Sequence, residues 1–290
     1  SDTNGDDTLR VKKILQQLSA DTVDLILGPL YFDNFRLTAA FALQNQIPIV
    51  SPVKQSNKLL LGNPFIFKAI PSKTTTLKEI CNMVADSFKT ENLLAIAHNT
   101  SKEQELIAPY IQTYNHQILS VDDTTLYASI KTIAVDQDIT VVLSHLRADQ
   151  NNVIFVPSTN QTFITKLFSF LATTLNQKKY ENYNITLLGL EEWVGFENIE
   201  LSYFQKLNVH YCTTQHINFE DAEVDKFIKK SIDQEKVYPS KNTFLGFDLA
   251  YFLGKNLTEK GTLFSENLSN TFNGLSINLS FLKTGVESGF

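Results

Sequence analysis

The feature that most constrains the fold of this chain is an alternation of short apolar runs with segments of helical periodicity. The stretch VDLIL, from Val23 to Leu27, is typical of a parallel strand that is buried on both faces. Apolar residues at helical spacing flank it at residues 8–18 and 35–43. A repeating strand–helix order predicts a parallel sheet with right-handed crossovers and helices on both faces. The sequence therefore predicts an α/β protein.

The same alternation continues along the whole chain. We expect strands at residues 23–27, 48–50, 65–69, 93–97, 118–121, 153–156, 185–190 and 209–212, and helices at residues 8–18, 35–43, 74–88, 103–114, 139–146, 163–175, 222–232 and 244–257. Asp6 or Asp7 is expected to cap the first helix. This many strands suits two sheets better than one. Because no linker rich in proline or glycine separates two halves, we expect two lobes joined by several short crossings.

Composition excludes two classes of protein. The chain has 290 residues, of which 43% are hydrophobic, so it can bury a sizeable core. Its net charge of −6 argues against a nucleic-acid partner, which would require a basic face. No stretch reaches the roughly 18 consecutive apolar residues of a membrane-spanning helix. We therefore expect no nucleic acid partner and no transmembrane segment in this chain.

The sequence lacks the usual signatures of catalysis. It contains no nucleophile elbow, phosphate-binding loop, dinucleotide-binding glycine motif or zinc motif. The five histidines show no metal-ligand spacing. Cys81 and Cys212 are expected in the core, and they can form a disulfide only if the fold brings them together. The sequence thus predicts a protein that is not an enzyme and holds no metal or cofactor.

Polar and aromatic residues follow several of the expected strands. In a parallel sheet the carboxyl ends of the strands meet at one edge, where open α/β folds bind ligands. The candidate ligand-binding residues are Tyr31, Ser51, Lys54, His98, Ser158, Glu192 and Trp193. Five of them also have a purely structural interpretation: the serines as helix caps, Lys54 and His98 as surface residues, and Trp193 as core. Their shared position after strands favours a ligand cleft.

Five stretches carry a resemblance to a known family. They are VDLILGPLYFDNFRLTAAFALQNQIPIVSPVKQSNKLL, NPFIFKAIPS, NVIFVPS, YPSKNTFLGFDLAYFL and LLGLEEWVGF. The first four, in this order, resemble the type I periplasmic binding proteins of the leucine/isoleucine/valine-binding kind. The fifth resembles a Bacteroidetes branch of that family in which the domain often follows peptidoglycan-binding LysM modules. The Gly-Pro-Leu turn also resembles the lipoprotein activators of penicillin-binding proteins.

The resemblance implies a two-lobed solute receptor. One lobe would hold residues 1–90 and 239–275, and the other residues 91–238 and 276–290. Three crossings would form the hinge, and a small polar ligand, such as an amino acid or a short peptide, would bind between the lobes for transport or sensing. Glu192 would accept a hydrogen bond from a ligand ammonium, and Trp193 would close over the apolar part. The location would be periplasmic or outer-membrane-associated.

Two departures from the family leave an alternative open. Family members begin with a strand, a helix and a second strand that have no counterpart here, so one or more N-terminal strands are expected to be missing. Amino-acid binders carry a serine in the first glycine turn, where this chain has Leu30 and Tyr31. Lys54 would suit an anionic group instead. The alternative is a ligand-free cell-envelope module that contacts peptidoglycan or an envelope protein.

Overall fold

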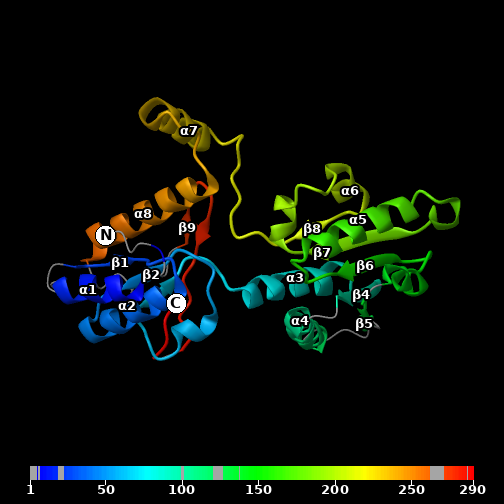
Figure 1. Ribbon diagram of the computed structural model, residues 1–290, viewed down its shortest axis with the longest axis horizontal. Helices are drawn as coiled ribbons and strands as arrows, with labels where there is room; N and C mark the ends of the chain where they lie inside the picture. The colour runs from blue at the N-terminus through cyan, green and yellow to red at the C-terminus, as the bar shows by residue number, and fades with distance from the viewer. Residues whose placement is uncertain are drawn as a thin grey trace. The chain divides into compact units, whose positions relative to one another are not determined.

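The computed structural model describes residue 5 and residues 7–18, 23–98, 101–119, 127–136, 138–261, 271–285 and 287–290. The chain forms two compact units (Figure 1). Unit 1 contains residues 1–73 and 214–290, and unit 2 contains residues 74–213. The chain therefore passes between the units after Lys73 and again after Thr213. This division differs from the expected lobes at residues 74–90, 214–238 and 276–290.

Unit 2 is built on a parallel sheet with the strand order β5-β4-β6-β7-β8. The strands are β4 (Asn92–Ala97), β5 (Lys131–Ala134), β6 (Asn151–Phe155), β7 (Asn184–Gly189) and β8 (His210–Tyr211). The three central strands are almost entirely buried. Their near-continuous apolar sequences fit this position, because helices cover both faces of the sheet.

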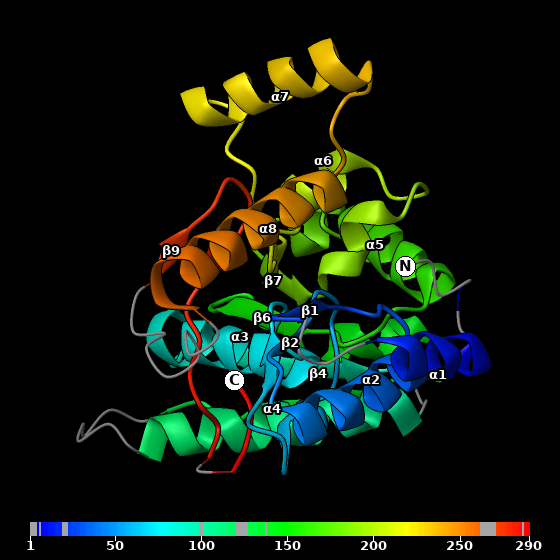
Figure 2. The same cartoon turned by 90° about the vertical axis from the view of Figure 1, so that its left-hand side faces the viewer.

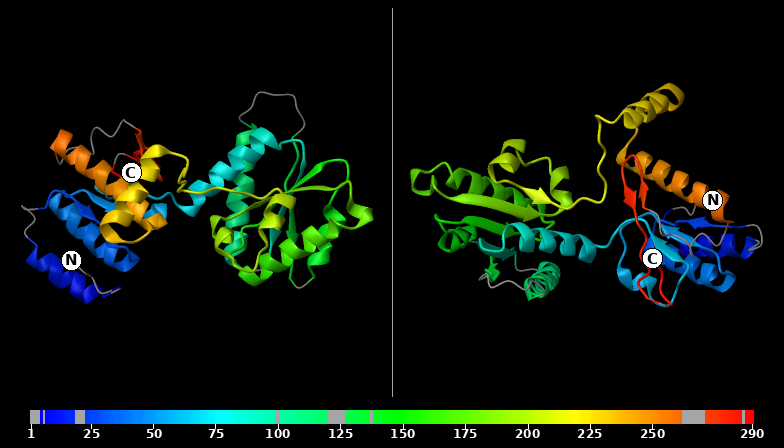
Figure 3. Two further views of the ribbon diagram at one scale, coloured as in Figure 1. Left: turned by 90° about the horizontal axis from the view of Figure 1, so that it is seen from above. Right: turned by 180° about the vertical axis from the view of Figure 1, so that it is seen from behind.

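The two faces of this sheet carry separate cores, and Figure 3 shows helices on both sides. Helices α3 (Lys73–Ser87) and α4 (Ser101–Leu119) pack on one face, where Cys81, Tyr110 and Tyr114 meet Phe155. Helices α5 (Gln161–Thr174) and α6 (Leu201–Lys206) pack on the other face. The apolar side of α3 is thus buried against β4 and β6, which is why residues 74–90 belong to unit 2.

Unit 1 contains the three-stranded parallel sheet β1-β2-β3. Its parallel strands are β1 (Ile26–Leu27), β2 (Ile49–Ser51) and β3 (Ile66–Lys68), and its helices are α1 (Thr8–Gln17), α2 (Phe32–Asn45), α7 (Ala222–Glu235) and α8 (Lys241–Lys260). Side chains alternate along the strands, so Ile49 and Ile66 face α2 whereas Val50 and Phe67 face α8. Figure 2 shows α2 and α8 on opposite sides of this sheet.

The C-terminal segment completes unit 1. An antiparallel hairpin of β9 (Phe272–Asn273) and β10 (Asn278–Leu279) lies next to α8. Phe290 then stacks on Phe67, with ring centroids 4.7 Å apart, and its backbone bonds to both Ile66 and Lys68. Residues 276–290 are therefore anchored in unit 1, not in the second lobe.

Helix α7 also belongs to unit 1. Phe227 of α7 packs against Phe244 and Phe247 of α8, with ring centroids 4.9 and 4.7 Å apart. The backbone N–H of His216 also donates to the Ser276 carbonyl oxygen at 2.9 Å, so residues 214–238 group with unit 1 instead of with the second lobe.

Most of the expected elements are present, and the α/β class is confirmed. Asp7 caps α1, because its side chain accepts hydrogen bonds from the backbone N–H groups of Leu9 and Arg10 at 3.0 Å; Asp6 lies outside the described residues. The strand expected at 118–121 is wrong at Ile118 and Leu119, which end α4, and the other two positions are not described. Strand β5 and the β9–β10 hairpin were not expected.

The two cysteines are not joined by a disulfide and should react very differently. Cys81 is fully buried, its thiol donates a hydrogen bond to the Tyr110 carbonyl oxygen at 3.3 Å, and burial raises its pKa to about 12. We expect alkylation of folded protein by iodoacetamide at pH 8 to modify partly exposed Cys212, while Cys81 reacts about 10³-fold more slowly than an unperturbed thiol. Peptide mass spectrometry with and without denaturant measures this, and equal labelling of both cysteines in folded protein would contradict it.

Candidate functional site

The carboxyl ends of the unit 2 strands line up along one edge of the sheet. Asp136 follows β5, His98 follows β4, Ser158 follows β6, and Glu192 follows β7. Because the strand order is β5-β4-β6-β7-β8, these four positions run along the edge in that sequence. The expected gathering of polar residues at this edge is therefore present in unit 2.

His98 lies in a cavity of about 370 Å³ at this edge. Its ring stacks on Phe163, with centroids 4.7 Å apart, and its backbone N–H donates to the buried Glu103 carboxylate at 2.7 Å. Its Nδ1 atom is buried and makes no hydrogen bond to any described residue. The ring is thus held in place while one nitrogen keeps its hydrogen-bonding capacity.

The rim of this cavity is polar, and most of its residues were not among the candidates expected from the sequence. Exposed Asp136, Asn160, Thr162 and Lys166 surround His98. Together they offer a carboxylate, an amide, a hydroxyl and an ammonium group, and a volume of this size suits a small molecule. Asn160 and Thr162 could have been found from the sequence, because they lie at the start of the helix that follows β6. Asp136 could not, because β5, the strand before it, was not predicted.

Trp193 and Ser158 are fully buried, which corrects the expectation that Trp193 closes over a ligand. The indole Nε1 of Trp193 donates to the Ser158 carbonyl oxygen at 2.8 Å, and the ring packs edge-on against Phe168. The Ser158 hydroxyl accepts from the Asn160 backbone N–H at 3.1 Å. Both residues therefore shape the loop that carries Asn160, and neither presents its side chain to solvent.

The two glutamates that follow β7, Glu191 and Glu192, have different surroundings. Glu191 accepts a hydrogen bond from the Thr213 hydroxyl at 2.8 Å, which ties the end of β7 to the segment after β8. Glu192 is partly exposed at the same edge. Glu192 therefore stays a candidate for contact with a ligand.

In unit 1 the turn after β1 projects apolar side chains outward. Gly28 has a φ of +88°, a conformation that side chains disfavour, and Leu30 and Tyr31 follow it at 59% and 50% exposure. Ser51 is fully buried at the end of β2, where its hydroxyl donates to the Val53 carbonyl oxygen at 3.3 Å. Lys54 is exposed. Tyr31 and Lys54 are therefore accessible to a ligand, whereas Ser51 holds the loop.

Lys68, which the sequence analysis missed, is the most unusual polar residue of this edge. It ends β3 opposite Ser51 in the parallel register, and its ammonium group donates to Asn57 Oδ1 at 2.6 Å. Partial burial lowers its pKa to about 8. A lysine with a perturbed pKa at the carboxyl edge of a parallel sheet is a candidate anion-binding group. The only sequence signal is a cation inside the apolar run FIFKAI.

Within the described part of the chain, no three histidine, cysteine, aspartate or glutamate side chains are grouped so as to hold a metal ion. None of the described helices combines the length and the apolar character needed to cross a membrane.

Comparison with known proteins identifies the fold. No protein-family model and no curated protein matches the sequence. An ABC transporter substrate-binding protein from Desulfitobacterium hafniense, solved in complex with Leu, is 14% identical with a TM-score of 0.62 over 100% of this chain and 81% of that one. A branched-chain amino acid ABC transporter protein from Rhodospirillum rubrum has a TM-score of 0.69 at 11% identity, over 95% of this chain and 78% of that one.

A third similar structure comes from a longer protein. Full-length LpoA from Haemophilus influenzae is 12% identical with a TM-score of 0.59, and the match covers 98% of this chain but 48% of LpoA. The two substrate-binding neighbours are type I periplasmic binding proteins. This chain has the two-lobed α/β fold of those proteins.

Proposed function

We propose that this chain is a non-enzymatic solute-binding domain of the extracytoplasmic receptor type. The observation that carries the proposal is the set of polar side chains at the carboxyl edges of both parallel sheets, with a cavity around His98. The likeness to ABC transporter substrate-binding proteins supports it, since one of them is solved with leucine. The corresponding location is periplasmic or outer-membrane-associated, and the role is transport or sensing.

The chemistry of the His98 cavity favours a zwitterionic ligand. Asp136 suits an ammonium group, Lys166 suits a carboxylate, and His98 suits neutral polar atoms. An amino acid or a short peptide carries both charges. In unit 1, the ammonium groups of Lys68 and Lys54 also suit a carboxylate. Tyr31 supplies an exposed aromatic surface for an apolar side chain.

A second candidate function is a ligand-free module of the cell envelope that contacts peptidoglycan or an envelope protein. The burial of Ser51, Ser158 and Trp193 favours it, because three of the expected ligand contacts are not accessible. The resemblance to the Bacteroidetes branch with LysM modules also supports this second candidate function.

A thermal-shift screen of the purified protein against amino acids, short peptides and muropeptide fragments tests the proposal. A ligand at 100 times its dissociation constant adds about 2.7 kcal/mol, which raises the melting temperature by several degrees. We expect such a shift with amino acids or short peptides. No shift with any of them, for protein that melts cooperatively, would contradict solute binding and favour the envelope module.

Lys68 provides the pH dependence of this binding. Only the protonated amine attracts a carboxylate, so affinity for an anionic ligand should fall as the pH rises through about 8. Lys68→Met should remove this dependence and weaken binding, whereas Lys12→Met, at an exposed position on α1, should change neither.

A further inference from the structure

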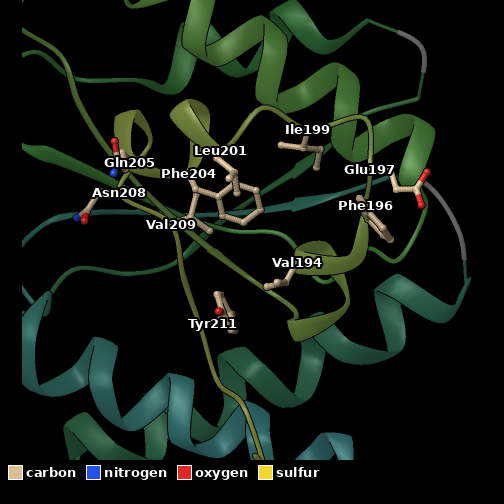
Figure 4. Close-up of a pocket in the computed structure, with 10 residues that line it drawn as sticks. All are labelled: Val194, Phe196, Glu197, Ile199, Leu201, Phe204, Gln205, Asn208, Val209 and Tyr211. Atoms are coloured by element: carbon tan, nitrogen blue, oxygen red, sulfur yellow. The ribbon is translucent and has the colours of Figure 1, made fainter. Parts of the chain in front are cut away.

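We propose that unit 2 carries a second binding surface, beside β8, for a basic and apolar segment of another protein in extended conformation. We call this surface the β8 groove. It is lined chiefly by Val194, Leu201, Phe204, Val209 and Tyr211, with Glu197 at its rim, and it encloses about 750 Å³ (Figure 4). The inference goes beyond the proposed solute binding and does not depend on it.

Several large apolar side chains of the groove are exposed to solvent. Leu201 is 82% exposed, Val194 56% and Tyr211 40%. Phe204 and Val209 lie between them and pack against the buried core of unit 2. Because its floor is part of that core, the groove is already formed without a partner. A contiguous apolar hollow of this kind is typical of an interaction site.

The neighbouring strand favours a partner in extended conformation. Among the described strands, β8 is the last of its sheet and pairs with β7 alone, through Leu188 with His210 and Gly189 with Tyr211. An edge strand turns one row of backbone N–H and C=O groups away from the sheet, where another strand can pair with it. Val209 and Tyr211, two positions apart, both line the groove, so an added strand would find pockets for alternate side chains.

The charge around the groove favours a basic partner. Glu197 is the one charged residue among the described residues that line the groove, and Glu200 directly precedes Leu201, whereas Lys206 directly follows Gln205. Complementary charge steers association and disfavours acidic partners. An anionic lipid surface and a second copy of this chain, whose net charge is −6, are both poor occupants by the same argument. A segment that alternates lysine or arginine with aliphatic residues fits both the charge and the groove.

The groove is separate from the cavity around His98. That cavity lies at β4 and β5, at one end of the strand order, whereas β8 is the opposite end. A substitution in the groove can therefore be tested without altering the His98 cavity.

Fluorescence anisotropy with a labelled Lys-Val-Lys-Val-Lys-Val-Lys peptide tests the proposal. We expect saturable binding that Leu201→Asp weakens by about tenfold or more. Leu119→Asp is the matched control, because Leu119 is 85% exposed at the end of α4 in the same unit. Circular dichroism establishes that both variants are folded. Equal affinity of the two variants would overturn the proposal.

Two control peptides separate the groove from general attraction between charges. A peptide with glycine in place of each valine keeps the charge but loses the apolar side chains, and a peptide with glutamate in place of each lysine reverses the charge. We expect both to bind at least about tenfold more weakly than the parent peptide. Binding of the glycine peptide as tightly as the valine peptide would show simple electrostatic attraction and contradict the proposed groove.

Discussion

Replacing Asp248 with alanine is expected to lower the free energy of unfolding by about 3 to 5 kcal/mol. Asp248 is fully buried in α8, and its carboxyl group accepts hydrogen bonds from the backbone N–H groups of Leu275 and Ser276 at 2.7 and 2.8 Å. The Ser276 hydroxyl donates a third bond at 2.8 Å. The substitution leaves these donors without their acceptor and opens a hole beneath the turn between β9 and β10.

Urea unfolding followed by circular dichroism measures this loss. Glu259→Ala is the matched control, because Glu259 is an exposed carboxylate on the same helix and its loss should change stability by no more than about 0.5 kcal/mol. An Asp248→Ala variant as stable as the Glu259→Ala variant would show that the hairpin is not held by this carboxyl group.

The Gly189→Ala substitution is expected to destabilise the protein by about 3 kcal/mol. Gly189 ends β7, and a Cβ atom there would lie 2.0 Å from Trp193 Cζ3. The indole would have to move, and Trp193 is fully buried with its Nε1 bonded to the Ser158 carbonyl oxygen. The added methyl group should therefore break this hydrogen bond and disturb the loop after β6.

The fluorescence of Trp193, the only tryptophan, reports this change directly. We expect a red-shifted emission and a lower urea midpoint for Gly189→Ala. Gly195→Ala is the control, since a Cβ atom at Gly195 meets nothing within 4 Å. Unchanged emission and stability in Gly189→Ala would mean that the indole does not pack against Gly189.

The elements that could be predicted from the sequence are those with a strong local pattern. The central strands of unit 2 are continuous apolar runs and were found almost to the residue, as with Leu93 to Ala97. Strand β5 was missed because Ile133 is its only buried residue. The apolar pair Ile118–Leu119 suggested a strand, but it continues α4. Where burial and tertiary packing decide whether a segment forms a strand or a helix, the local sequence pattern did not predict it.

The candidate site shows the same limit. His98 and Glu192 were expected directly after strands, and both lie at the carboxyl edge of the sheet. It did not reveal that Ser51 and Trp193 are buried, because exposure depends on what packs around each residue. Lys68 was missed for the same reason, since its lowered pKa arises from burial, which no sequence pattern shows.

The most direct test of solute binding is an NMR titration of the ¹⁵N-labelled protein with the ligand that gives the largest shift in the thermal screen. The proposal predicts that the largest amide shift changes fall at the carboxyl ends of the strands, such as at His98 and Asp136 in unit 2. Residues at the opposite end of the unit 2 sheet, such as Asn92 and Asn152, should change little. Shift changes confined to that opposite end, or none at saturating ligand, would contradict binding at the carboxyl edges.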